Sequence, residues 1–172
     1  FFEKLKLNPN PHSVEHLYRW LADREFSITT DGNFIAYKGL RNDFGSITPG
    51  PGIVNGVPQS GNLDNSPGNI LEMARKDVEF NPSIGCSTGL HAGTWDYARS
   101  FAGGGRVVEV HINPRDVVSC PTDCADSKLR VSRYTVVQEL KDPYTEAYVP
   151  TVAAEEKPKP KRDSRGRFVK NG

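Results

Sequence analysis

The residues best suited to chemistry lie in one glycine-rich stretch that runs from Gly85 to Gly93. Within it, Cys86 and His91 could act as a nucleophile and a general base, but a spacing of five residues fixes no geometry and no third, orienting group is evident. A cysteine in a turn is more commonly structural, and His91 could either contact a polar ligand or hydrogen-bond the loop backbone. The candidate ligand-binding residues are Tyr37, Lys38, Ser87, Thr88 and His91.

Two further arrangements could hold an ion. The glycine-rich stretch precedes a predicted helix, and a helix N-terminus favours anions, although the lysine and glycine spacing of nucleotide-binding loops is absent. Cys120 and Cys124 together with His111 could supply three zinc ligands. Because the fourth ligand is missing, we expect no metal and no cofactor.

Basic residues fall in two places. Lys38, Lys128, Arg130 and Arg133 could line a basic surface if their strands are neighbours, or simply form a solvated strand face. The chain carries a net charge of +1, but the last 18 residues alone carry +4 and the remainder −3. A basic tail of this kind could bind nucleic acid, anionic lipid or an acidic protein surface. Its candidate contact residues are Lys157, Lys159, Lys161, Arg162, Arg165 and Arg167.

The elements that must position these residues begin with a helix and a hairpin. Asn10 and Pro11 are typical of a helix start, and Val14, Leu17, Tyr18 and Leu21 recur at helical spacing. Residues 26–29 alternate polar and apolar side chains, as in a half-buried strand. Asp31-Gly32 is a strong turn signal, and residues 34–38 would be the returning strand. We therefore predict an amphipathic helix followed by a β-hairpin.

The glycine-rich stretch leads into a second helix, which we place at about residues 94–102. Thr94 is a plausible N-cap, Trp95 and Phe101 recur at helical spacing, and Gly103 suits the helix end. We expect Trp95 and Phe101 to be largely buried, so that Phe101→Ala would cost ~3–5 kcal/mol of stability. A valine-rich strand follows over residues 106–112.

The rest of the chain is less regular. Residues 41–69 are interrupted by glycine and proline and predict a long irregular loop, with a small hairpin around Asn55-Gly56. Residues 70–73 predict a strand that could end at Val78, and residues 129–140 a last strand with a bend near Arg133. We therefore expect an α+β domain with a mixed or antiparallel sheet over residues 11–148. Residues 1–10 would be a linker or the end of a preceding segment, and residues 149–172 a basic Pro/Lys-rich, disordered tail.

Composition sets outer limits on the class of protein. The chain has 172 residues, of which 36% are hydrophobic, enough for one domain with a core. No run approaches the ~20 apolar residues that cross a bilayer. Three cysteines argue against a disulfide framework and for a reducing compartment. Because residue 1 is Phe, we expect a fragment or a processed product.

Several segments, taken in order, resemble one family. They are Phe26–Gly32 leading to Phe34–Lys38, Asp64–Gly68 leading to Met73–Arg75, Cys86–His91, Arg106–Val110, Asn113–Ser119, Lys128–Arg130 and Tyr134–Val137. In this order they are similar to the C-terminal domain of the RIIB-like proteins of tailed bacteriophages, over about residues 14–139.

The resemblance implies a phage protein made in an infected bacterium. It implies a non-catalytic accessory role in lysis timing, host-membrane effects or resistance to host exclusion, exerted through a phage or host protein partner. It would place the protein in the host cytoplasm, with membrane association or the virion as alternatives. It implies neither a reaction nor an oligomeric state. A structural virion component that docks through the basic tail is the alternative function.

A more distant likeness suggests an enzyme. The order of Tyr37-Lys38-Gly39, a Ser-Thr segment, a valine-rich strand and a last strand resembles ADP-ribosyltransferases, which need a glutamate on that last strand. Residues 131–136 contain no carboxylate, and Gln138-Glu139 comes too late. The likeness implies that the chemistry has been lost, or else a nucleotide-handling enzyme with Tyr37, His91 and Glu139 around an NAD-sized cleft.

Overall fold

The structure is a computed structural model that describes residues 1–22 and 24–141. Its α-helices are α1 (Phe2–Leu5), α2 (Pro11–Ala22) and α3 (Trp95–Ala102). Its strands are β1 (Phe34–Leu40), β2 (Gly50–Val54), β3 (Val57–Gly61), β4 (Ile70–Glu72), β5 (Leu90–Gly93), β6 (Arg106–Ile112), β7 (Val117–Ser119), β8 (Lys128–Val131) and β9 (Arg133–Leu140). Short 3-10 turns cover Arg75–Asp77, Pro114–Asp116 and Cys124–Asp126.

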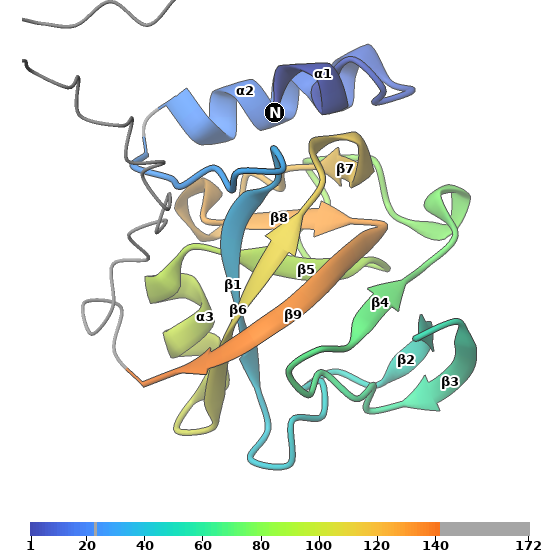
Figure 1. The fold of residues 1–172 in the computed structure, drawn as a ribbon, viewed down its shortest axis with the longest axis vertical. Coiled ribbons are helices and arrows are strands. Elements are labelled where there is room, and N and C mark those ends of the chain that lie inside the picture. The colour runs from blue at the N-terminus through green and yellow to red at the C-terminus, as the bar shows by residue number, and fades with distance from the viewer. Residues whose placement is uncertain (23, 142–172) are drawn as a thin grey trace, which may run out of the picture.

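Within the described residues, the nine strands form one sheet in the order β3-β2-β4-β9-β6-β1-β5-β8-β7. Every strand pair in it is antiparallel, which confirms the α+β class. Figure 1 shows α1 and α2 beside each other above the sheet and α3 against its lower part. Helix α2 packs on β7 at one edge of the sheet, whereas α3 packs on the central strands β1 and β6.

The predicted first helix is confirmed as α2. Asn10 Oδ1 accepts a hydrogen bond from the His12 N–H at 2.9 Å, as an N-cap does. Leu17, Trp20 and Leu21 are buried, and the Trp20 ring lies 6.4 Å from that of Phe34 on β1. Tyr18, which the periodicity placed on the buried stripe, is instead 49% exposed, because the buried face of α2 is centred on Leu17 and Trp20.

The hairpin that should follow α2 is only half formed. Its returning segment is β1, but residues 26–29 make only an isolated bridge, between Ile28 and Phe34. Phe26 and Ile28 are 38% and 44% exposed. Strand β6 pairs along one whole side of β1, and β5 occupies the other side at Tyr37. Only the start of β1 is left for the incoming segment, where the Ile35 N–H donates to the Ser27 carbonyl oxygen at 3.0 Å.

The first ten residues, expected to form a linker or the end of a preceding segment, pack against the domain instead. Leu5 of α1 is 4% exposed and belongs to the core. The Asn8 side-chain amide donates to the carbonyl oxygens of Pro114 at 3.0 Å and Val117 at 2.9 Å. These hydrogen bonds join residues 1–10 to a segment that lies more than 100 residues further along the chain. The expected boundary near residue 148 lies outside the described residues.

Helix α3 confirms the predicted element but corrects its buried face. Thr94 Oγ1 accepts from the Tyr97 N–H at 3.3 Å, and Gly103 ends the helix at φ 61°. Phe101 is nevertheless 46% exposed, whereas Ala98 is fully buried. The Ala98 carbonyl oxygen and the backbone and Cβ atom of Ala102 face Gly39 of β1. This close approach turns the aromatic residues to the flanks, where Trp95 packs edge-on against Tyr37.

Replacing Gly39 with alanine is therefore expected to destabilise the fold by about 1–3 kcal/mol. A Cβ on residue 39 would overlap the Ala98 carbonyl oxygen and crowd Ala102, so α3 would have to move off the sheet. Gly50→Ala is the matched control, because a Cβ there would meet nothing within 4 Å. Equal urea midpoints for the two variants would contradict this packing.

The region predicted to be irregular contains the small hairpin expected around Asn55-Gly56. Strands β2 and β3 pair from Gly50↔Gly61 to Val54↔Val57. Asn55 and Gly56 have φ values of 50° and 80°, which is the backbone that a two-residue hairpin turn requires. The strand expected to end at Val78 is shorter than predicted: β4 ends at Glu72, and the chain then forms the 3-10 turn at Arg75–Asp77.

The predicted last strand is divided in two at the expected bend. Strand β8 pairs with β5 and β7, whereas β9 pairs with β6 and β4. Ser132 lies between them, and its N–H donates to the Asp116 carbonyl oxygen at 2.9 Å. The chain thus moves from one half of the sheet to the other at this point, which accounts for the change in side-chain parity near Arg133.

Candidate functional site

The segment before β5 is held in place by a buried arginine on β8. Arg130 is 0% exposed. Its guanidinium donates to the carbonyl oxygens of Glu79 (3.3 Å), Asn81 (3.1 Å), Gly85 (3.1 Å) and Ile84, and to Ser119 Oγ at 3.3 Å. We call residues 79–89 the β5 loop. A planar fork with five N–H donors is suited to gathering several carbonyl groups in this way.

Lys128, two residues earlier on β8, adds a second contact to the β5 loop. Its ammonium group donates to the Gly85 carbonyl oxygen at 2.6 Å and to Asp123 Oδ2 at 2.7 Å. Lys128 and Arg130 are both buried, so neither belongs to a solvated strand face. Two of the four basic residues that the sequence grouped therefore bind the backbone of the β5 loop. Arg133, by contrast, pairs with Glu72 at 2.9 Å, with both side chains partly exposed.

Lys38 lies on the opposite face of the sheet from Tyr37, because side chains alternate along β1. Its ammonium group donates to the His91 carbonyl oxygen at 2.7 Å and lies 5.7 Å from the centre of the Tyr134 ring. Burial lowers the pKa of Lys38 to about 8. The Tyr134 hydroxyl in turn donates to Asn65 Oδ1, so Lys38 belongs to a polar arrangement inside the core.

His91 shares a sheet face with Tyr37, Lys128 and Arg130, as the strand registers show. Burial, followed by the charges of Lys38, Arg130 and Lys128, lowers the pKa of His91 to about 3. The ring is therefore neutral at physiological pH. Two of these cations, Arg130 and Lys128, hold the β5 loop, so the loop and the neutral histidine are parts of one arrangement.

Acidification is expected to destabilise the protein through His91. Between pH 6.5 and 3, the unfolded chain takes up a proton at this residue whereas the folded chain does not. Stability that is fully present above pH 6.5 is thus lost as the pH falls, by up to about 1.4 kcal/mol per pH unit. In His91→Gln the fall between pH 7 and pH 5, measured by urea unfolding, should be shallower. His12→Gln, which changes an exposed ring, should keep the wild-type slope.

The hydroxyl residues of the predicted ligand site lie on the outer part of the β5 loop. Ser87 is partly buried and Thr88 is exposed. The Thr88 carbonyl oxygen accepts from the Glu79 N–H at 2.8 Å, which closes the loop on itself. Cys86 is exposed. The structure thus places His91 directly after the β5 loop and Lys38 against the His91 carbonyl oxygen. Tyr37 lies beside β5, on the sheet face of the His91 side chain.

The zinc arrangement considered from the sequence is not formed. Cys120 is buried, whereas Cys124 is exposed. His111 is already used, since its Nε2 lies 2.7 Å from Glu109 Oε1. In the part of the chain that the structure describes, no group of three histidine, cysteine or acidic residues could hold a metal ion.

Sequence reasoning missed a polar cluster on the central strands. Glu109 of β6 is only 6% exposed and also accepts from Gln138 Nε2 at 2.9 Å. The hydrogen bond from His111 lowers the pKa of Glu109, and burial together with this carboxylate raises that of Tyr37. The signal was available, because Glu109 interrupts an apolar strand. Its partner Gln138, on β9, could be found only from the register.

The cleft proposed around Tyr37, His91 and Glu139 is not formed. Glu139 neighbours Gln138 on β9 and therefore points to the other sheet face. There it binds Arg106 through both carboxylate oxygens, at 3.0 and 2.9 Å. Tyr37 pairs with Glu109 across the strands and lies on the face of Gln138. The sheet thus separates Tyr37 from Glu139.

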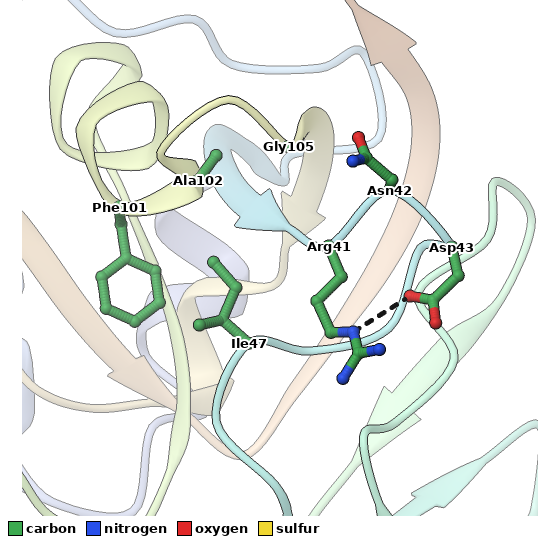
Figure 2. Close-up of a pocket in the computed structure, with 7 residues that line it drawn as sticks. All are labelled: Arg41, Asn42, Asp43, Ile47, Phe101, Ala102 and Gly105. Atoms are coloured by element: carbon green, nitrogen blue, oxygen red, sulfur yellow. Dashed lines mark ion pairs between the residues drawn. The ribbon is translucent and has the colours of Figure 1, made fainter.

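A hollow of about 460 Å³ lies elsewhere, between the end of α3 and the segment after β1. Figure 2 shows Phe101 and Ile47 as its apolar side chains and the Arg41–Asp43 ion pair at its other end. The ion pair measures 3.4 Å and is exposed. None of the ligand-binding residues expected from the sequence lines this hollow. The basic tail residues lie outside the described residues.

Comparison with known proteins identifies the class of protein to which the chain belongs. A family model described as "Bacteriophage T4 protein rIIB" matches residues 1–154, and the chain belongs to this family of phage proteins. It is 35% identical over 145 residues to Protein rIIB of Enterobacteria phage T4. That alignment covers 84% of this chain and 43% of the relative, so the chain spans less than half of the relative's length. No solved structure matches.

Proposed function

We propose that this chain acts by binding a protein partner during phage infection, in lysis timing, host-membrane effects or resistance to host exclusion. Membership of the rIIB family supports a phage accessory role. In the described residues, no helix is long and apolar enough to cross a membrane. The proposed site of action is the host cytoplasm, with contact to other proteins.

The observation that carries the proposal is an apolar groove between α1 and α2. It has a volume of about 340 Å³ and is lined by Phe2, Leu5, Lys6, Asn8, Pro11, Val14 and Tyr18. Phe2 is 61% exposed and Tyr18 49%. Exposed aromatic side chains around a groove are typical of protein-binding surfaces. Lys128 and Arg130, the cations that hold the β5 loop, are by contrast used within the fold.

The test is affinity purification of the tagged chain from infected cells. A double variant, Phe2→Ser with Tyr18→Ser, should lose the co-purified partner, because both changes remove apolar area from the groove. Val57→Ser is the matched control, since Val57 is 59% exposed but lies on β3. Retention of the same partner by the double variant would contradict the proposal.

Recovery of the chain in purified particles would favour the virion role, and a thermal shift with NAD that is lost in His91→Ala would favour a nucleotide-handling role.

Deletion of residues 153–172 is expected to leave the melting temperature nearly unchanged, because this composition contributes little to a core. The segment's positive charge should act on an acidic partner, and such attraction is screened over ~8 Å at physiological salt. Binding should therefore weaken steeply as salt rises and be lost when the lysines and arginines are neutralised. A large fall in melting temperature on deletion would show that the tail packs on the domain.

A further inference from the structure

Two exposed thiols lie on loops that are fastened to each other. Cys86 belongs to the β5 loop, and Cys124 lies in the segment that leads into β8, residues 120–127, which we call the β8 loop. Both side chains are exposed, whereas Cys120, the third cysteine, is buried. The binding proposal does not involve these cysteines.

Three contacts join the two loops next to the thiols. The Lys128 ammonium group bridges the carbonyl oxygen of Gly85 and the carboxylate of Asp123, the residues directly before Cys86 and Cys124. The Thr122 N–H donates to the Pro82 carbonyl oxygen at 3.0 Å. A Cβ built on Gly85 would overlap Asp123. Residues 85 and 123 are therefore in direct contact, and each cysteine is one residue from it.

The surroundings of Tyr97 place both thiols in one neighbourhood. The Tyr97 ring packs over Gly93 of β5. Burial, together with the nearby Cys124, Asp123 and Cys86, raises the pKa of Tyr97 to about 12. Two cysteines that are 38 positions apart in the sequence thus both lie near the same phenol.

The backbone at Cys124 can gain from rearrangement. Cys124, Ala125 and Asp126 have φ values of 51°, 53° and 54°, a left-handed run that is unfavourable for residues with a Cβ atom. A loop in this conformation has a lower-energy backbone available to it, so a change at Cys124 works against little intrinsic preference. The side chain of Cys124 is therefore in a position to adjust to the narrow geometry that a disulfide needs.

We propose that Cys86 and Cys124 form an intramolecular disulfide when the protein meets a disulfide oxidant. In the reaction, the thiolate of one cysteine attacks the oxidant disulfide and releases one thiol. The second cysteine then attacks the mixed disulfide and releases the other, so that two cysteine thiols are oxidised and one disulfide is reduced to two thiols. The product would lock the β5 loop to the β8 loop as a reversible bond, which is compatible with a chain that lacks a disulfide framework.

The test treats the reduced full-length chain with glutathione disulfide and follows intact mass and peptide maps. We expect the loss of two hydrogen atoms per chain, a single peptide pair that joins Cys86 to Cys124, and a melting temperature several degrees higher. Cys86→Ser and Cys124→Ser should each abolish the link and the shift. Cys120→Ser is the control, because burial raises the pKa of Cys120 to about 12 and so disfavours its thiolate. The Cys120→Ser variant should keep both the Cys86–Cys124 link and the rise in melting temperature.

Three results would overturn the proposal. The first is oxidised wild-type chain in which Cys86 and Cys124 carry only separate glutathione adducts. The second is a link that contains Cys120, and the third is a link between two chains that persists at low protein concentration. Dithiothreitol should reverse the mass change and the rise in melting temperature together.

Discussion

Replacing Arg130 with methionine is expected to lower the free energy of unfolding by about 3–5 kcal/mol. The guanidinium group is fully buried and donates to four backbone carbonyl oxygens of the β5 loop and to Ser119. Methionine fills a similar volume but donates no hydrogen bond, so these buried acceptors would lose their donor. Urea unfolding measures the change, and hydrogen exchange in residues 79–85 should accelerate.

Arg133→Met is the control for this prediction. Arg133 is an arginine on β9, the next strand along the chain, and its partly exposed ion pair with Glu72 should be worth less than about 1 kcal/mol. Arg130→Lys should be intermediate, since lysine keeps the charge but cannot reach several carbonyl groups at once. If Arg130→Met and Arg133→Met unfold at the same urea concentration, Arg130 does not organise the loop.

Replacing Phe34 with alanine is expected to cost about 3–5 kcal/mol through loss of apolar burial and formation of a cavity. Phe34 is 0% exposed on β1, and its ring contacts both Trp20 of α2 and Phe1. The substitution would thus loosen the packing of both N-terminal helices on the sheet. Thermal and urea unfolding both report the loss.

Phe101→Ala provides the comparison, because it removes the same side chain from a surface position. Because Phe101 is 46% exposed, its replacement should lower the free energy of unfolding by less than about 1 kcal/mol. This is far below the ~3–5 kcal/mol expected if the helical spacing had placed Phe101 in the core. A cost for Phe101→Ala equal to that of Phe34→Ala would mean that the α3 face is assigned incorrectly.

Local chemistry made much of the fold predictable. Asn10 caps α2, Thr94 caps α3, and Asn55-Gly56 turns the β2–β3 hairpin, because each signal acts over a few residues of backbone. Family membership was also readable from the order of short segments. By contrast, the exposure of Phe101 follows from Gly39, a residue on a different element, which allows the backbone of α3 to approach β1. Helical periodicity alone cannot identify which flank of a helix meets such a glycine.

The amino-acid sequence was enough to predict the class of the fold, the position of both longer helices and the family. Tertiary structure alone decided what the charged residues do. From the sequence, Arg130 and Lys128 are compatible with the solvated face of a basic strand. In the structure β8 pairs with β5, and both side chains bind the β5 loop. Glu109 finds His111 on its own strand and Gln138 on β9, while Glu139 turns to the opposite face. The physical reason is that a charge inside a protein is defined by its partners, and these partners come from strands and loops far apart in the chain.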